Sequence, residues 1–462
     1  MTNPRISGKV AKRAVWGLVR HPLRRPRLAA LLAIAGLVVS VAACGEEEEP
    51  APTPTTAVPA ATTAAPTPAP SEGVSGTVTM MRGPFSADDS VWEDPLVAAF
   101  NAKFPDVEII NTTYDWGAAD AEIAAAFASG SPPDIIYLPD QWYGQYAVAG
   151  QLEPITGLVN DPAFADDFAA IPQAFWDVAT IGGEIYGVPA LGVVFPIFLN
   201  LDLLEAAGVE DTWDDSYEAL ADAARKLTTD DVWGFSFRSE FIDAGYWDWF
   251  PYIQNAGGNV LNDDWTACGF NNPDVVSGVQ FLIDSIDEGY ALPPGEYDWA
   301  GQKALFAAGK IAINHNEGSF INELQTNDPG FRWDVVPAPS GPVTQTMMGN
   351  FGFLFISSAS ENKEAAWEFI KHWTSSEEAA AYTEANSLFS IRTDLVDPYA
   401  DNPLMARVLT EYVPMVKGIQ AHPRMREILN TIWPTFSAAY RGQYTAQEAV
   451  DKACADMATL LG

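Results

Sequence analysis

The chain has 462 residues, of which 25 are Lys or Arg and 61 are Asp or Glu, giving a formal net charge of −36. Eight of the basic residues and none of the acidic ones lie before residue 28, so the rest of the chain has a net charge of −44. Because this charge repels phosphates and anionic head groups, it argues against nucleic acid and against basic contacts with a membrane surface.

The first 43 residues have the pattern of an export signal. Basic residues precede an apolar run, LAALLAIAGLVVSVAAC, which ends at Cys44 after two alanines. The cysteine makes this segment resemble a bacterial lipoprotein signal, which implies that Cys44 receives a diacylglyceryl group and becomes the mature N-terminus. A transmembrane anchor is the alternative, but the run has about 16 apolar residues and a bilayer span needs roughly 20.

Residues 44–75 have the composition of a disordered tether. Residues 46–49 are glutamates, and residues 50–71 are rich in Pro, Thr and Ala, with no aromatic residue and no Leu or Ile. Such a segment cannot bury enough apolar surface to offset its chain entropy. The roughly 390 residues that follow exceed one ordinary domain, so we expect two lobes, each with its own core.

Strands and helices alternate from the start of this body, which is typical of a parallel α/β sheet. In chain order we expect strands at 77–81, 107–111 and 135–138, with helices at 91–104 and 118–128 between them. Ligands bind beyond the carboxyl ends of such strands. The candidates that follow these strand ends are Arg82, Phe85, Asp140, Gln141 and Trp142.

Several further stretches carry a family resemblance in their order and spacing. They are FNAKFPDVEI, AAAFASGSPPDIIYLPDQW, AGQLEPI, GGEIYGVPALGVVFPIFLNLDLLEAAG, ALFAAGKIAINHNEGSF and GNFGFLFISSASENKEAAWEFIKHWTSSEEA. From about residue 78 to residue 460 the chain resembles the family-one extracellular solute-binding proteins of ABC importers. This resemblance implies a monomeric sugar or oligosaccharide receptor without a cofactor, which delivers its ligand to a permease at the outer face of the cytoplasmic membrane.

The resemblance also implies the two-lobed fold of type II periplasmic binding proteins, with hinge crossings between the lobes. We expect the crossings near residues 189–200, 350–357 and 403–414. Lobe one then comprises residues 76–190 and 357–404, and lobe two residues 191–356 and 405–462. In lobe two and the C-terminal part, helices are expected at 216–227, 275–286, 365–373 and 446–460, and strands at 232–237 and 310–314.

A sugar site combines aromatic planes for CH faces with fixed polar groups for hydroxyls. Relatives place ligand contacts where Asp140, Gln141 and Trp142 stand, and a stacking ring near Trp247; Trp249 is a second candidate. A helix cap and core tryptophans are the alternative interpretation of these residues. Further candidates by position in the family are Glu317, Asn350, Phe351, Arg392 and Arg424.

Two of these last five residues, Glu317 and Arg392, depart from the family pattern. Glu317 stands near the position of a tryptophan in many relatives, which suggests more polar recognition. Asn350 and Phe351 begin the second crossing, although a tightly packed hinge strand would have the same glycines around it. Arg392 ends a turn in which relatives have a proline that is missing here. Arg424 belongs to a basic stretch, and a solvated patch on the surface is the alternative interpretation of that stretch.

Cys268 and Cys454 remain after Cys44 is lipidated. Outside the cell they either form a disulfide or stay as two buried thiols. The sequence has no Cys-x-x-Cys spacing, no His cluster, no G-x-S-x-G, no H-E-x-x-H and no P-loop, so we expect neither a metal site nor an enzyme. Two alternatives stay open: the same fold binding a cation such as a polyamine, and a glycan-binding surface sensor or adhesin without transport.

Overall fold

The computed structural model describes residues 73–462, apart from 86–87, 211–215, 240–246, 248, 296, 298, 387, 389 and 396–401. The signal, Cys44 and nearly all of the tether therefore lie outside the described residues. The chain divides into two units, Met1–Pro66 and Thr67–Gly462, and every described residue is in the second. None of the described helices has the length and apolar composition that a bilayer span requires.

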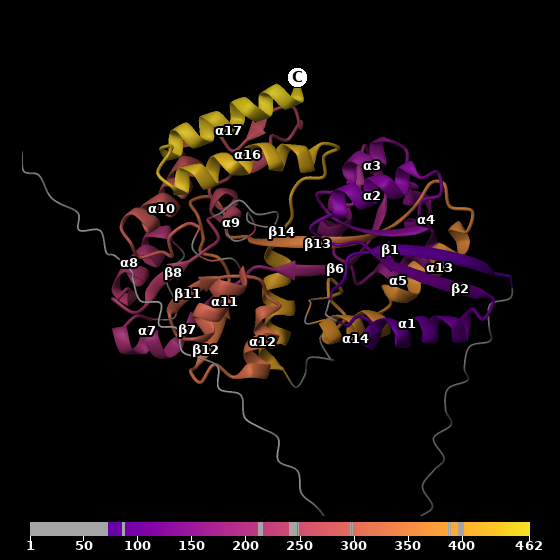
Figure 1. Ribbon diagram of the computed structural model, residues 1–462, viewed down its shortest axis with the longest axis horizontal. Helices are drawn as coiled ribbons and strands as arrows, with labels where there is room; N and C mark the ends of the chain where they lie inside the picture. The colour runs from indigo at the N-terminus through magenta and orange to yellow at the C-terminus, as the bar shows by residue number, and fades with distance from the viewer. Residues whose placement is uncertain are drawn as a thin grey trace, which may run out of the picture. The chain divides into compact units, whose positions relative to one another are not determined.

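The first sheet contains the three strands expected at the start of the body (Figure 1). Its strands are β1 (Gly76–Arg82), β2 (Val107–Thr113), β3 (Ile135–Pro139), β6 (Gly187–Val194), β13 (Met347–Ile356) and β14 (Val416–Lys417). β1 is parallel to β2 and β3, whereas β13 is antiparallel to β3 and β6. The carboxyl ends of β1, β2 and β3 therefore meet at one edge of the sheet.

Helices pack on both faces of this sheet (Figure 1). They are α1 (Ser90–Lys103), α2 (Ala119–Ala128), α3 (Gly144–Val148), α4 (Thr156–Val159), α5 (Ala165–Phe168), α6 (Gln173–Val178), α13 (Lys363–Trp373) and α14 (Ser376–Asn386). In α1 the buried residues are Trp92, Leu96 and Phe100, four apart, which is the stripe that one helix face presents to a core.

The second sheet runs in the order β12-β7-β11-β8. Its strands are β7 (Ile197–Asn200), β8 (Trp233–Ser236), β11 (Ile311–His315) and β12 (Trp333–Val336). The surrounding helices are α7 (Leu201–Ala207), α8 (Tyr217–Leu227), α9 (Phe250–Gln254), α10 (Pro273–Asp287), α11 (Trp299–Ala307), α12 (Phe320–Asn327), α15 (Pro403–Arg407), α16 (Met425–Tyr440) and α17 (Ala446–Leu461). Residues of α8, α10, α16 and α17 share one buried cluster with β7 and β8.

Strand pairing shows where the first two crossings lie. The first passes through Phe195 and Pro196, between β6 of the first sheet and β7 of the second, inside the expected range. The second was expected at 350–357, but β13 pairs with β14, β6 and β3 along its whole length, so the chain enters the first sheet at Met347. In the third expected range, 403–414, Arg407 of α15 pairs with Asp334 of the second sheet, and β14 then adds to the first sheet.

A disulfide joins Cys268, in the short strand β10 (Cys268–Gly269), to Cys454 in α17, with the two Cα atoms 5.2 Å apart. The bond ties the last helix to a strand 186 residues earlier. The two cysteines therefore form a disulfide and are not two separate buried thiols.

We expect Cys268→Ser to lower the free energy of unfolding by about 2–4 kcal/mol, because closing a long loop removes conformational freedom from the unfolded chain. Urea denaturation of the oxidised parent and of the variant measures this difference. Dithiothreitol should destabilise the parent and leave the variant unchanged. An equal effect of the reductant on both proteins would contradict the prediction.

Candidate functional site

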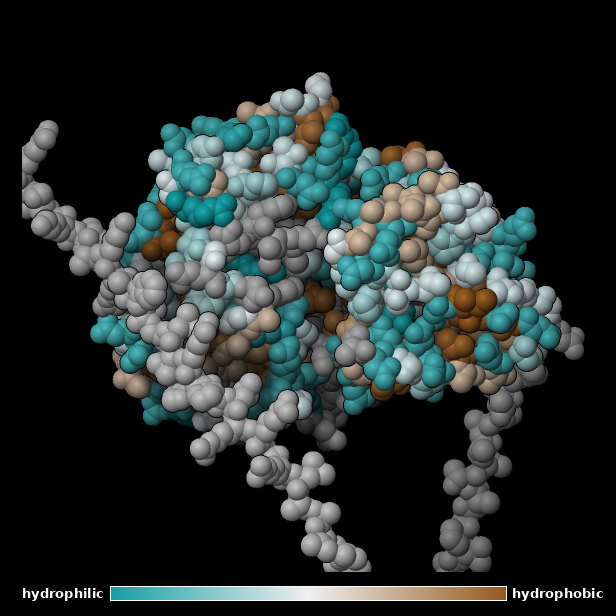
Figure 2. Space-filling model, in the orientation of Figure 1, coloured by the Kyte–Doolittle hydropathy of each residue, from teal (hydrophilic) through white to brown (hydrophobic). Residues whose placement is uncertain are grey.

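A cavity of about 760 Å³ lies between the carboxyl edge of the first sheet and the end of β11 in the second. Its wall is mainly apolar and aromatic, whereas the face of the molecule in Figure 2 is mainly hydrophilic. The volume is in the range of small-molecule sites. The aromatic, polar and charged side chains of the wall include Phe85, Trp116, Asp120, Gln141, Trp142, Phe195, Trp247, Glu317, Asn350 and Arg426.

Aromatic rings from both sheets form two walls of the cavity. On the first, the rings of Trp116 and Trp142 have centroids 6.0 Å apart, and the Trp116 indole N–H donates to the carbonyl of Pro84 at 2.7 Å. On the second, Trp247 stacks on Phe195 with centroids 5.2 Å apart and an interplanar angle of 28°. Trp116 is 37% exposed, so its ring is available to a ligand.

Three buried polar atoms of the cavity wall have no hydrogen-bond partner among the described residues. They are Gln141 Oε1, Trp142 Nε1 and Asn350 Oδ1. Buried polar atoms are nearly always paired in folded proteins. A polar ligand would supply hydrogen-bond partners for this one donor and these two acceptors.

Asp140 is buried next to Gln141 in the sequence and is not among the residues that line the cavity. Burial raises the pKa of its carboxyl to about 8, although the backbone N–H of Gln141 donates to Oδ1 at 2.8 Å and opposes the shift. The carboxyl is therefore mostly protonated at neutral pH and adds little charge to the site.

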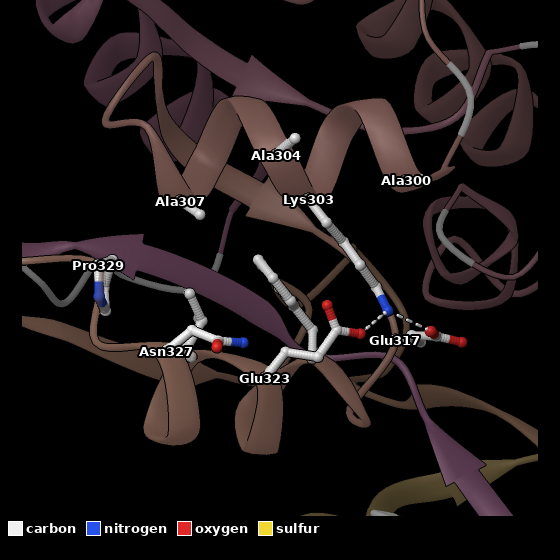
Figure 3. Close-up of a pocket in the computed structure, with 10 residues that line it drawn as sticks. Ala300, Lys303, Ala304, Ala307, Glu317, Glu323, Asn327 and Pro329 are labelled. Carbon is white, nitrogen blue, oxygen red and sulfur yellow. Dashed lines mark hydrogen bonds and ion pairs between the residues drawn. The ribbon is translucent and has the colours of Figure 1, made fainter. Parts of the chain in front are cut away.

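Glu317 follows β11 and is held by a lysine (Figure 3). The Lys303 ammonium, from α11, lies 2.6 Å from Glu317 Oε1 and also pairs with Glu323 on α12. Glu317 lines both the large cavity and a smaller hollow of about 440 Å³ between α11 and α12. The ion pair thus stands where the two spaces meet.

Arg426, near the start of α16, crosses to the first lobe. Its guanidinium lies 3.2 Å from a carboxylate oxygen of Asp120 on α2, and its central carbon lies 4.8 Å from the centroid of the Trp142 ring. The cation–π contact and the ion pair together hold one side of the cavity.

Residues 83–380 match the model of the bacterial extracellular solute-binding proteins, which is more than half of the chain. The chain belongs to this family. Family and fold are those of binding proteins, as the resemblance in the sequence had implied.

Three members of the comparison illustrate how far the likeness extends. A binding protein of Brucella abortus is 23% identical over 380 residues, covering 80% of this chain and 89% of that protein. The maltotriose-binding protein of Pyrococcus abyssi is 24% identical over 296 residues, covering 61% and 59%. The GacH receptor of Streptomyces glaucescens, solved without ligand and with acarbose, superposes with a TM-score of 0.72 at 24% identity and covers 84% of this chain and 99% of its own.

In this solute-binding protein, six of the twelve predicted site residues lie on the cavity wall: Phe85, Gln141, Trp142, Trp247, Glu317 and Asn350. Their contact with a ligand stays a prediction. Asp140 is buried and is not among the lining residues. The other five predicted residues are absent from the described lining, and packing or ion pairs explain the position of each.

Two of these five are aromatic residues that pack elsewhere. Trp249 is 2% exposed and meets Trp433 of α16 edge to face, with ring centroids 4.8 Å apart. Phe351 is 3% exposed and meets Phe175 edge to face at 4.7 Å. Both rings therefore stabilise the core, as the alternative interpretation of the sequence allowed.

The other three are arginines in ion pairs. Arg82 is buried and its guanidinium contacts Asp89 and Glu93, each at 2.5 Å. Arg392 pairs with Asp394 through two nitrogens and also donates to backbone carbonyls. Arg424 is exposed to solvent and pairs with Glu427, which is the solvated basic stretch considered above.

Sequence reasoning missed Trp116, Asp120 and Arg426. Trp116 stands three residues after β2, so the strand-end rule that selected Arg82 and Asp140 would have selected it too. Arg426 lies two residues beyond Arg424, and only the position of the α16 start at Met425 decides which of the two arginines faces the cavity. Nothing in the sequence indicates that choice.

Proposed function

We propose that this chain is the substrate-binding lipoprotein of an ABC importer and captures a neutral sugar or oligosaccharide in the cavity between its sheets. The observation that carries the proposal is the combination of aromatic rings on opposing walls with polar atoms that lack partners among the described residues. Rings stack on the CH faces of sugars, and fixed polar atoms bond hydroxyls. The acarbose complex and the maltotriose-binding relative agree with such a ligand.

The ligand would be captured because residues of both lobes line the cavity. Trp116 and Trp142 belong to the first lobe, and Trp247 and Glu317 to the second. A ligand that touches both walls stabilises the closed arrangement of the lobes more than the open one, and this difference drives hinge closure. The closed form then docks on a permease.

Attachment to the cell completes the proposal. Lipidated Cys44 holds the protein at the outer face of the cytoplasmic membrane, and the tether of residues 44–75 lets a monomeric body reach the permease. The composition of the tether supports this role, because it favours an extended chain.

The test is a thermal-shift screen of the purified protein against mono- and oligosaccharides, polyols and polyamines. A ligand present at 100 times its dissociation constant should add about 2.7 kcal/mol to the free energy of unfolding, which raises the melting temperature measurably. We expect a dose-dependent rise with one class of neutral sugar. A well-folded sample that responds to no sugar would overturn the proposed ligand class, and a rise with polyamines alone would replace it with a cation.

A further inference from the structure

The cavity carries little net charge although the chain is strongly acidic. The chain has a formal charge of −36, yet the acidic side chains described at the cavity are each offset. Asp120 pairs with Arg426, Glu317 pairs with Lys303, and Asp140 is buried with its pKa raised to about 8. Of these pairs, that of Glu317 and Lys303 lies in a single lobe, so hinge motion leaves it intact.

The Lys303 side chain is mostly buried, so its position is set by its neighbours in the fold. Its side chain is 14% exposed, and its ammonium lies 5.5 Å from the centroid of the Phe320 ring. Burial alone would lower the pKa of Lys303, but Glu317 and Glu323 raise it above its ordinary value. The lysine is therefore charged throughout the physiological range, and it is shared between Glu317 at the cavity and the half-exposed Glu323 on α12.

The backbone that carries Glu317 is fixed to the first crossing between the lobes. The N–H of Asn316 donates to the carbonyl of Pro196 at 3.2 Å, and the N–H of Gly318 donates to the carbonyl of Val194 at 2.8 Å. Glu317 itself donates its N–H to Asn316 Oδ1 at 2.9 Å. The carboxylate consequently cannot leave the cavity wall through a shift of its loop.

The ion pair occupies one oxygen of Glu317, and the other oxygen has no hydrogen-bond partner among the described residues. Oε1 accepts from Lys303, while the second oxygen points away from the ammonium in Figure 3. A carboxylate oxygen can accept a hydrogen bond from a hydroxyl or from an ammonium group. What separates these two ligand classes is the net charge that the wall presents, and that charge depends on Lys303.

We propose that Lys303 is a specificity-determining residue that makes the cavity select neutral hydroxylated ligands over cationic amines, by neutralising Glu317 while leaving one of its oxygens free to accept. The inference rests on the proposed function for its neutral ligand. Without Lys303, Glu317 would present an uncompensated carboxylate between aromatic rings, which is a favourable site for an ammonium group.

The test uses spermidine as a cationic probe and compares Lys303→Met with the parent by isothermal calorimetry. We expect the variant to bind spermidine at least tenfold more tightly than the parent, and the gain to disappear in Lys303→Met/Glu317→Gln. Lys452→Met is the matched control, since Lys452 pairs with Asp456 on α17 and its loss changes the net charge by the same amount. This control should show no gain, which separates the cavity from general attraction to an acidic surface.

Equal spermidine affinity in the parent and in Lys303→Met would overturn the inference, as would a gain that persists in the double variant or occurs equally in Lys452→Met. Lys303→Gln serves if the methionine variant does not fold, because it removes the charge and keeps a polar hydrogen-bond donor at this position. The readout is spermidine binding, so it is independent of the sugar screen. Failure of every sugar to bind the parent would sink the proposed function without producing any of these outcomes.

Discussion

Trp116→Ala should weaken binding of the best sugar of the screen by ten- to a hundredfold, in a protein that is still folded at the temperature of the titration. Loss of one stacking ring at a binding site costs about 1–3 kcal/mol. Trp116 is 37% exposed and lies on the cavity wall, so the ring is available to a ligand; it also packs against Tyr114 and Tyr137, so some stability is lost with it. Calorimetric titration of parent and variant with the same sugar measures the change.

A second variant tests whether the position of the ring, and not only its presence, matters. An added Cβ at Gly83 would come within 2.2 Å of the Trp116 ring, so Gly83→Ala should displace the indole and reproduce much of the loss. Trp116→Phe should keep most of the affinity, because it retains a flat ring. If Trp116→Ala binds the sugar as tightly as the parent does, this wall takes no part in recognition.

Local pattern was enough to predict the first sheet and the residues at its edge. The strands β1, β2 and β3 and the helices between them lie within a few residues of the expected ranges, because strand and helix periods depend on neighbouring residues only. Gln141 and Trp142 line the cavity for the same reason, since they follow a strand end.

Contacts between residues far apart in the sequence determined the features that could not be predicted. The apolar run of β13 would fit a strand in either sheet, and only its hydrogen bonds to β3 and β6 assign it to the first. Trp247 and Trp249 stand two residues apart, yet one lines the cavity while the other packs against Trp433. The sequence alone does not indicate which of the two tryptophan rings packs against another ring in the core.

Asp140→Asn should stabilise the empty protein by about 1–3 kcal/mol at pH 9 and by almost nothing at pH 4, because it removes the cost of a buried charge. Burial raises the pKa of this carboxyl from 3.8 to about 8. Below pH 4 both the folded and the unfolded chain hold the proton. Between pH 4 and 8 only the unfolded chain loses it, so the free energy of unfolding of the parent falls as the pH rises.

Urea denaturation at pH 4, 7 and 9 measures the difference between parent and variant. Removing any carboxylate also relieves repulsion in so acidic a chain, and Asp166→Asn, at an exposed position, calibrates that contribution. A difference that grows from pH 4 to 9 in Asp140→Asn, and not in Asp166→Asn, locates the effect at the buried carboxyl. A constant difference would mean that Asp140 is ionised in the folded protein over the whole range, and the cavity would then present a charge that neither Lys303 nor Arg426 offsets.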